Sequence, residues 1–451
     1  MKLGEGTYGM IYKKGDRAVK NFKDVDEDGE NKYIVETTMC KYLTNNYTIR
    51  CLSYNFFNFS FEMELGIPVK TFIDNNPKFL RPIIDSFIGS VNYMHNHGIL
   101  HLDIKPDNMV IVDNRVKLID FGLSTYISNE FISSDSAITS LYRPPELFVT
   151  DCPSHPSLDI WSVGITILEL VTKENIIRKL YDQLNNFVKI FLNYGSQLVD
   201  ISFQNFDIKN KDYYIQLTNK MLKMDPNERQ LGPILKFNIP FELIKMQTPY
   251  DIIISDSIGW LISVLKIYST VHTIYLASKL FYQTLPPDLE NNKIQVWLAA
   301  CMKISDIVTN FDPALTYKRI YKHSQGVASE TITKNFISRI LEKLNYDVRS
   351  NDSYLYLNEK IVKMVADSSQ YEEDMDNFYM LMSYQPKLFE IEPEILFKAY
   401  QAINNGEVLD QEQRQICQLL IQTLNNFDLL YKKNTDHAFS PIFRDKLNKY
   451  K

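Results

Sequence analysis

Hydrophobic and polar positions change their periodicity along the chain and separate it into regions. Near the N-terminus, short apolar strands flank a Lys-Lys-Gly-Asp turn at residues 13–16, which predicts a β-hairpin. Residues 83–97 instead repeat apolar side chains at helical spacing. Beyond residue 241, helix follows helix without strand alternation, and no repeat of fixed period is visible. The pattern predicts an α+β region followed by an all-α region.

Length and composition narrow the class of protein. At 451 residues the chain is longer than one ordinary domain, so we expect two or three domains. A hydrophobic fraction of 45% and a charged fraction of 23% are typical of a soluble globular protein. The net charge of −6 gives no reason to expect a nucleic acid or an anionic membrane as a partner. The most apolar stretch, residues 252–268, is interrupted by Ser255, Asp256 and Lys266, so we expect no membrane span, and we expect no signal peptide.

The cysteines lie far apart and show no paired spacing of the kind that disulfides or zinc sites use. We therefore expect a reducing compartment, which means the cytoplasm, the nucleus or both. Few glycines and many Asn, Ile, Tyr and Lys residues are typical of an AT-rich genome, such as that of a protist or a large DNA virus. A virus-encoded protein would act in a host cell. The cysteines are Cys40, Cys51, Cys152, Cys301 and Cys417.

Two short sequences bring together the residue types that phosphoryl transfer needs. An H-x-D-x-K-x-x-N sequence begins at His101, and a D-F-G sequence begins at Asp120. Phosphoryl transfer requires a carboxylate beside the attacking hydroxyl, a cation that neutralises phosphate charge and oxygen ligands for magnesium. Asp103 can supply the first of these and Lys105 the second. Asn108 and Asp120 offer the hard oxygen atoms that Mg²⁺ prefers. Each residue alone is common in loops, but the joint pattern resembles the catalytic and metal-binding loops of the eukaryotic protein kinases.

This resemblance implies a bilobal protein kinase fold of the α+β class, with ATP and Mg²⁺ as cofactors. The nucleotide-binding lobe would span residues 1–66 and the helical lobe residues 67–241. A G-x-G-x-x-G sequence lies in the predicted hairpin, where glycines let backbone N–H groups approach phosphates. By the same resemblance, the residues around the nucleotide are Gly4, Gly6, Gly9, Ile11, Ala18, Lys20, Glu36, Phe61, Glu62 and Glu64.

Lys20 would hold the α- and β-phosphates, as the corresponding lysine of kinases does, and it needs a carboxylate partner. Glu36 lies inside the apolar period of the next predicted helix and is the favoured partner. Glu30 is the rival, but it ends an acidic run that is typical of a solvated loop.

The strand predicted at residues 59–64 leads, by the same resemblance, into the hinge between the lobes. Phe61 would be a bulky gatekeeper residue. Backbone groups of Glu62 and Glu64 would then contact adenine.

Further sequences place the resemblance within the cyclin-dependent kinases. The loop sequence Gly-Glu-Gly-Thr-Tyr-Gly is the form found there, and in that family its Thr and Tyr, here Thr7 and Tyr8, receive inhibitory phosphates. The alternative is that both are only lid residues. The T-x-x-Y-R-x-P-E sequence from Thr139 is shared with the MAP kinases and accompanies a preference for proline after the target Ser or Thr. Thr139 would hydrogen-bond with Asp103 and Lys105, and Lys105 indicates a Ser/Thr kinase.

Two further motifs imply structural contacts. A D-x-W-S-x-G sequence begins at Asp159, whose counterpart in kinases braces the catalytic loop. A D-P-x-x-R sequence ends at Arg229, which would pair with Glu146. A buried ion pair of this kind is structural and costly to halve, and it is not catalytic.

One departure from the family concerns the activation loop. In cyclin-dependent kinases three arginines bind its phosphate, and the matching positions here are Val35, Leu102 and Thr125. Ser134 aligns with the residue that is usually phosphorylated, but a dianionic phosphate needs basic donors to order a loop. We therefore expect activity that does not require phosphorylation of Ser134.

The C-terminal half resembles a cyclin. Degenerate forms of the cyclin-box sequences occur at Trp260, at Thr273 and within residues 293–307. An unrelated helical regulator is the alternative, because apolar helices form the core of any all-α domain. The resemblance divides this half into a linker, a cyclin box and a second cyclin-like or otherwise helical domain, at residues 242–251, 252–350 and 351–451.

Lys303 aligns with the cyclin lysine that contacts the kinase near the glutamate-bearing helix. The partner glutamate of that family falls on Ile337, and the substrate-docking patch falls on the polar residues 255–257. An ordinary polar helix face is therefore the alternative explanation for Lys303.

The expected function is that of an ATP-dependent Ser/Thr kinase of the cyclin-dependent type. It would be proline-directed and activated by its own cyclin-like half, either within one chain or by domain swapping. Protein substrates with Ser/Thr-Pro sites are the expected partners. The alternatives are a pseudokinase scaffold and a kinase whose helical half only docks substrates. The intact residues Lys20, Asp103, Asn108 and Asp120 argue against the pseudokinase.

Overall fold

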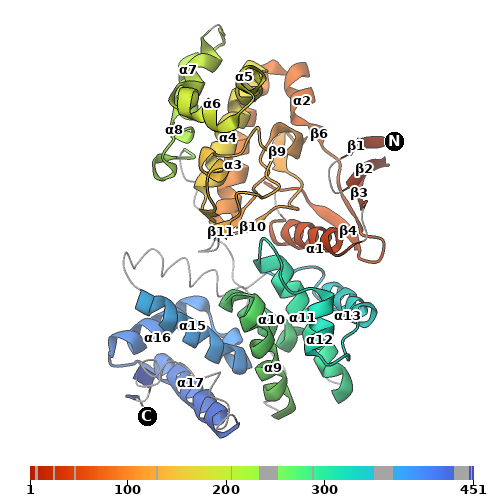
Figure 1. Cartoon of the computed structure of the whole chain (residues 1–451), viewed down its shortest axis with the longest axis vertical. Coiled ribbons are helices and arrows are strands. Elements are labelled where there is room, and N and C mark those ends of the chain that lie inside the picture. Colours follow the sequence, from red (N-terminus) through yellow and green to blue (C-terminus); the bar gives the residue numbers. More distant parts are fainter. Residues whose placement is uncertain are drawn as a thin grey trace. The chain divides into compact units, whose positions relative to one another are not determined.

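The chain divides into two compact units, Met1–Ile239 and Pro240–Lys451, which are called the kinase-like unit and the helical unit below. Figure 1 shows the helices and strands of both. The predicted linker at 242–251 lies outside the described residues, as do residues 351–368 of the last predicted domain. The computed structural model describes residues 1–5, 9–23, 26–44, 47–127, 131–204, 206–232, 252–286, 289–349, 369–430, 446–447 and 449–450.

The kinase-like unit begins with a five-stranded antiparallel sheet in the order β1-β2-β3-β5-β4. Gly15 makes the predicted turn between the second and third strands with φ +62°, a conformation that glycine adopts without steric cost. The five strands are β1 (Lys2–Glu5), β2 (Gly9–Lys14), β3 (Arg17–Phe22), β4 (Cys51–Asn55) and β5 (Ser60–Glu64).

Helix α1 (Glu27–Tyr42) packs against β4. Its N-cap is Asp26, whose Oδ1 accepts a hydrogen bond from the Gly29 N–H at 2.9 Å. Acidic residues in the first turn favour the positive end of the helix dipole. The buried face of α1 includes Tyr33, Met39 and Glu36, so this helix brings a carboxylate to the sheet together with its apolar residues.

The remainder of the kinase-like unit is mainly helical, and the helix expected at 83–97 is α3. Helix α4 carries apolar residues on all of its faces, and accordingly it is buried along its whole length. The helices are α2 (Val69–Asn75), α3 (Leu80–Asn96), α4 (Ser157–Thr172), α5 (Ile176–Leu184), α6 (Phe187–Tyr194), α7 (Leu198–Phe203) and α8 (Lys211–Met221). Short strands between them are β6 (Ile67–Pro68), β7 (Ile99–Leu100), β8 (Met109–Val112), β9 (Arg115–Leu118), β10 (Thr125–Tyr126), β11 (Phe131–Ile132) and β12 (Cys152–Pro153).

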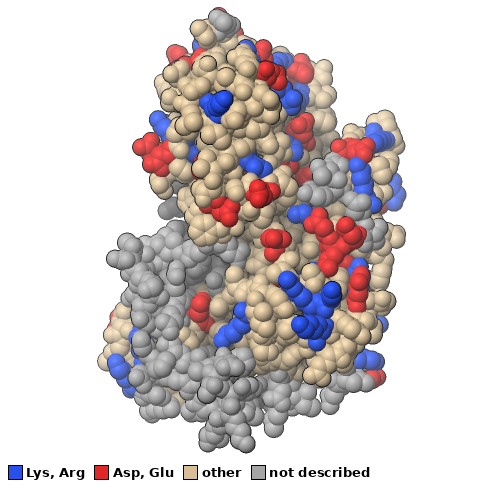
Figure 2. Space-filling model, in the orientation of Figure 1, with Lys and Arg blue, Asp and Glu red and all other residues tan. Residues whose placement is uncertain are grey.

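The helical unit contains helices and no strand in its described part, as its sequence predicts. Helices α10 and α11 pack together, and α9, α13 and α15 pack against them. Figure 2 shows Lys and Arg side chains gathered over the α12 region, where Lys318, Arg319 and Lys322 are exposed. The helices are α9 (Ile252–Tyr268), α10 (Val271–Thr284), α11 (Asn291–Thr309), α12 (Tyr317–His323), α13 (Glu330–Lys343), α15 (Ser369–Tyr384), α16 (Pro393–Asn405) and α17 (Gln411–Leu430).

Membrane-spanning helices were sought along the described ranges of the chain. None of the helices there combines the length and the apolar character that crossing a bilayer requires.

Candidate active site

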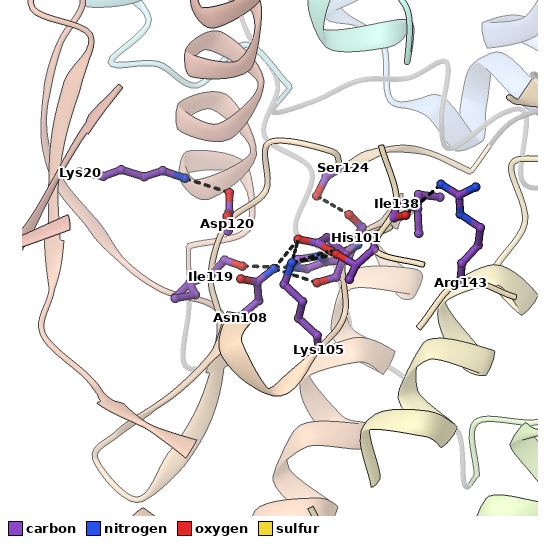
Figure 3. Close-up of polar contacts among 11 residues, drawn as sticks. Lys20, His101, Lys105, Asn108, Ile119, Asp120, Ser124, Ile138 and Arg143 are labelled. Atoms are coloured by element: carbon purple, nitrogen blue, oxygen red, sulfur yellow. Dashed lines mark hydrogen bonds and ion pairs between the residues drawn. The ribbon is translucent and has the colours of Figure 1, made fainter. Parts of the chain in front are cut away.

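The loop between β7 and β8 gathers the predicted catalytic residues into one hydrogen-bonded group. The Thr139 hydroxyl donates to Asp103 Oδ1 at 2.6 Å. The Lys105 ammonium lies 2.8 Å from Asp103 Oδ2 and 2.9 Å from Thr139 Oγ1. Figure 3 shows the side chains of Lys105 and Asn108, which belong to this loop, close together. The predicted contact of Thr139 with Asp103 and Lys105 is therefore confirmed, and hydrogen bonds to both of its oxygens hold the Asp103 carboxylate in a defined orientation.

The catalytic loop is held in place by Asp159, near the start of α4. Asp159 is 1% exposed and accepts the N–H groups of His101 at 2.8 Å and Leu102 at 2.9 Å. Leu102 has φ +62°, so the loop depends on these bonds to keep a conformation that leucine rarely adopts. Burial raises the pKa of Asp159, but its hydrogen bond to His95 and the His101 N–H outweigh this, and the pKa lies below its ordinary value. The predicted brace is present.

Lys20 connects the sheet, α1 and the D-F-G segment. Its ammonium lies 2.8 and 2.6 Å from the two carboxylate oxygens of Glu36 and 2.9 Å from Asp120 Oδ1. In Figure 3 the Lys20 side chain points from the sheet toward Asp120. Glu36, not the rival Glu30, is therefore the carboxylate on α1 that pairs with Lys20 at these distances.

The charges of this group do not cancel, because two carboxylates share one ammonium. Burial raises the pKa of Glu36 to about 7, and the Lys20 ammonium only partly offsets that effect. Burial also raises the pKa of Asp120, but Lys20 outweighs it, so the Asp120 carboxyl stays below its ordinary pKa. Burial lowers the pKa of Lys20, yet the two carboxylates raise it above its ordinary value. The surplus negative charge favours a bound cation.

Residues predicted to surround the nucleotide share one face of the sheet. The register pairs Ile11 with Lys20 and Lys20 with Phe61, and Ala18 lies two residues before Lys20 on the same face. Gly9 lies so close to β3 that a Cβ atom there would approach the Asn21 carbonyl oxygen to 2.8 Å. Gly4 pairs with Ile11 on the edge strand β1. Gly6, Thr7 and Tyr8 lie outside the described residues.

The end of β5 limits which backbone groups could contact adenine, and the predicted adenine contacts stay a prediction. β5 continues through Glu64, whose N–H donates to the Arg50 carbonyl at 3.1 Å, so this N–H is not available to adenine. Glu62 is a ladder residue between β3 and β4. Phe61 lies level with Lys20, whereas Met63 lies opposite Ala18 and closer to the end of the strand. The register therefore favours Met63 over Phe61 as the residue beside the start of the hinge.

Asn108 and Asp120 suit a hard cation. The Asn108 side-chain nitrogen donates to the Asp103 carbonyl and to Asp103 Oδ2, both at 2.8 Å. This orientation leaves Asn108 Oδ1 for a cation. Asp120 has φ +65° and a side chain that is 30% exposed, with Oδ1 on Lys20. An amide oxygen and an ionised carboxylate are oxygen donors of the type that Mg²⁺ prefers, so the residues fit the predicted metal.

The activation segment is held by a side chain whose role the sequence did not reveal. Arg143 donates to the backbone carbonyls of Ser134 at 3.0 Å and Ile138 at 2.9 Å, and also to that of Ser136. Asp151 Oδ1 accepts the Ser134 N–H at 2.7 Å. The T-x-x-Y-R-x-P-E sequence drew attention to Arg143, but its spacing carries no information about carbonyl partners, and nothing in the sequence marks Asp151.

Two buried contacts tie the end of this segment to the helical part of the unit. Arg229 pairs with both carboxylate oxygens of Glu146, at 2.6 and 2.8 Å, as predicted. The Tyr142 hydroxyl donates to Glu169 Oε2 of α4 at 2.6 Å. The segment is therefore attached to the same helix that braces the catalytic loop.

Lys303, the predicted kinase contact, lies on α11 in the helical unit. It is 1% exposed, and its ammonium lies 5.3 Å from the centroid of the Tyr317 ring. Ile337, where the family has a glutamate, is fully buried on α13. The role of Lys303 as a contact between units stays a prediction.

The fold and the site define the class of protein: a sheet lobe and a helical part carry a lysine–glutamate pair, an aspartate held by a lysine and a threonine, and two oxygen donors that suit a cation, as in phosphotransferases of the kinase type. Comparison with protein families agrees, because the protein kinase domain matches residues 1–232. Since this match covers more than half of the chain, the chain belongs to the protein kinase domain family.

Individual relatives point to one branch of the family. Cyclin-dependent kinase-like 1 of Caenorhabditis elegans is 32% identical over 190 residues, which covers 38% of this chain and 54% of the relative. A putative cyclin-dependent serine/threonine-protein kinase of Dictyostelium discoideum is 31% identical over 215 residues, covering 42% and 31%. Cyclin-dependent kinase F-3 of rice is 36% identical over 93 residues, covering 21% and 22%. The chain thus spans about half of the first relative and less of the others.

Proposed function

We infer that the chain is a Ser/Thr protein kinase of the cyclin-dependent type that uses ATP and Mg²⁺. The observation that carries this inference is the assembled site, in which Lys20 pairs with Glu36 and Asp120 while Asp103 is held by Lys105 and Thr139. The similarity to cyclin-dependent kinases at modest identity supports the choice of branch.

Each residue of the site would have a distinct role. Asp103 accepts the hydrogen bond of the substrate hydroxyl and takes up its proton as the phosphoryl group is transferred. Lys105 stabilises the charge that develops on that group, and Lys20 orients the α- and β-phosphates. Asp120 and Asn108 would hold Mg²⁺, which supplies charge neutralisation at the phosphates when it is bound.

The test of this inference is transfer of labelled γ-phosphate from ATP to a Ser-Pro peptide by the full chain. Asp120→Asn removes a charge at the cation site and should abolish transfer. Asp113→Asn is the matched control, because Asp113 is exposed on a turn with φ +49°, a conformation that asparagine adopts readily. A wild-type chain that binds nucleotide but transfers no phosphate would favour the pseudokinase scaffold.

Activity without phosphorylation of the activation loop is the second part of the inference. Arg143 and Asp151 support it, because they already bind the backbone around Ser134. The positions of the usual phosphate-binding arginines are neutral and buried, which also supports it: Val35, Leu102 and Thr125. Ser134→Ala protein should keep more than about a tenth of wild-type activity, since a larger loss exceeds ~1.4 kcal/mol of barrier.

We further propose that the helical unit activates the kinase-like unit, as a cyclin does, within one chain or by domain swapping. The all-helical character of its described part supports this role. A ten-residue linker reaches at most about 35 Å and would make the association intramolecular, at an effective concentration in the millimolar range. A helical unit that only docks substrates is the alternative. Its removal should then mainly raise KM for full substrates, whereas loss of an activator lowers kcat on a short peptide.

Substrate preference and location complete the proposal. Ser/Thr-Pro sites in proteins are the proposed substrates, in a reducing compartment of the cytoplasm or nucleus. A positional peptide library, run on the full chain and on residues 1–241, measures both the proline preference and the contribution of the helical unit. Equal activity of the two proteins would contradict an activating role.

A further inference from the structure

Two cysteines from different elements meet in the sheet lobe. Cys40 lies on α1 and is 1% exposed. Cys51 is the first residue of β4, is partly exposed and pairs with Met63 of β5. Helix α1 packs against β4. Cys51 lies opposite Met63 on the sheet face that carries Ala18 and Lys20, the face that Glu36 of α1 contacts, and the two thiols interact electrostatically. The contact therefore joins the helix to the sheet by two groups that can form a covalent bond.

Cys40 also lies next to the ion pair of the active site. It follows Glu36 by one helical turn, so both side chains lie on the same face of α1. The charges of Glu36 and Lys20 both act on the Cys40 thiol. A restraint at Cys40 consequently acts on the turn of α1 that carries Glu36.

We propose that Cys40 and Cys51 form a reversible disulfide that fastens α1 to β4 and keeps Glu36 paired with Lys20. A disulfide brings the sulfur atoms to about 2.05 Å, so it would join α1 to β4 covalently at their interface. The ion pair of Lys20 and Glu36 is already formed while both thiols are reduced. Oxidation would therefore preserve the existing arrangement of α1 and would not create a new one. In a reducing compartment such a bond is transient and reports the redox state.

The oxidant is a small-molecule disulfide such as oxidised glutathione. Burial raises the pKa of the Cys40 thiol, so the partly exposed Cys51 is the sulfur that reacts first. The Cys51 thiolate attacks one sulfur of the oxidant and releases one small thiolate, which forms a mixed disulfide. The Cys40 sulfur then attacks Cys51 and releases the second small thiolate. Two protein thiols are oxidised, one small disulfide is reduced to two thiols, and these carry the two protons.

The test uses the full-length protein treated with oxidised glutathione, alkylated and mapped by mass spectrometry without reduction. We expect one peptide pair joined through Cys40 and Cys51, which dithiothreitol separates. Hydrogen exchange of the α1 amides should slow by about tenfold or more on oxidation, because opening of the helix is then restrained. Cys40→Ser should leave Cys51 carrying glutathione. Cys152→Ser is the matched control, a buried cysteine of the same unit, and should still form the joined pair.

Two results would overturn the proposal. One is a wild-type protein in which Cys51 carries glutathione and no joined pair forms. The other is a joined pair that leaves the exchange of α1 unchanged. Both measurements are chemical, so their failure is distinct from a failure of kinase activity. Phosphate transfer by the oxidised protein should equal or exceed that of the reduced protein.

Discussion

Buried carboxylates have different surroundings in the two units. In the kinase-like unit, Asp120 and Asp159 lie beside a lysine and a histidine, and their pKa values lie below the ordinary value. In the helical unit, Asp306 of α11 is fully buried and its hydrogen-bond donors are neutral; burial raises its pKa, and the nearby Lys303 charge offsets this only in part. Ser269 and the Asn310 side chain donate to Asp306 Oδ1, and the Leu315 N–H donates to Oδ2 at 2.7 Å.

The comparison distinguishes two uses of a buried acid. A carboxylate that stays ionised can brace N–H groups or hold a cation, so Lys20 beside Asp120 and the hydrogen bond of His95 to Asp159 serve the proposed chemistry. A buried carboxylate whose hydrogen-bond donors are neutral connects loops, and its ionisation is a cost to the fold. The lowered pKa values of Asp120 and Asp159 are therefore consistent with a functional site, whereas the raised pKa of Asp306 is consistent with a structural role.

The largest effect is expected at the centre of the site. Asp103→Asn keeps the size of the side chain but removes the group that takes up the substrate proton, so kcat should fall by about 10²–10⁴-fold. Steady-state kinetics with a Ser-Pro peptide measure this effect. Folding should be unaffected, and an unfolded variant would show instead that Asp103 acts through the structure.

Breaking the buried pair of Arg229 and Glu146 should affect stability strongly. Glu146→Gln leaves the Arg229 charge, whose side chain is fully buried, without its ionised partner. The expected loss is about 3–5 kcal/mol of unfolding free energy in the kinase-like unit. Denaturant unfolding measures it, with the exposed Glu228→Gln as control. A loss below ~1 kcal/mol would place this pair with exposed ion pairs.

Each unit has a helix whose N-cap side chain can be removed by substitution. Asp26 caps α1, and Thr270 caps α10, where its Oγ1 accepts the Thr273 N–H at 3.5 Å. Replacement of either by alanine should cost about 1 kcal/mol of stability. Only Asp26→Ala should also lower phosphate transfer, since α1 carries Glu36. Equal activity of both variants would show that α1 tolerates fraying at its first turn.

The smallest effect concerns pH. The pKa of Asp159 is lowered on folding, so its contribution to stability is present at neutral pH and is lost as the pH falls through that value. The pKa of Asp306 is raised, so its contribution is present at acidic pH and is lost as the pH rises through the raised value. Relative to Asp306→Asn, the wild-type helical unit should therefore gain stability on acidification. Unfolding curves at several pH values would reveal the opposite slope if Asp306 were ionised throughout.

Sequence reasoning succeeded where chemistry restricts the choice of residue. The group around Asp103 and the Lys20–Glu36 pair were predictable, because each member belongs to a short motif or to one helical period. The partner of the Glu64 N–H was not predictable, because the end of β5 depends on its register with two other strands. That register is a tertiary property. The adenine contacts of Glu62 and Glu64 stay a prediction.

Contacts between distant loops were not predictable in the same way. Asp151 meets Ser134 only after the activation segment folds back on β12, and Cys40 meets Cys51 only after α1 packs on β4. The spacing of residues along the sequence predicts neither contact. For the helical unit, apolar periodicity predicted helices but could not define their function, since the same periodicity suits any all-α core.

Helix α4 has a consequence for how peptide and base are aligned. Asp159 lies near its start and Glu169 near its end, about 15 Å apart along the axis at 1.5 Å per residue. One residue orients the loop of the proposed base, and the other anchors the segment beside which a peptide would lie. The loop and the segment are therefore both positioned by the same helix, α4. A movement of the sheet lobe that admitted nucleotide would therefore leave the spacing between peptide and proposed base unchanged.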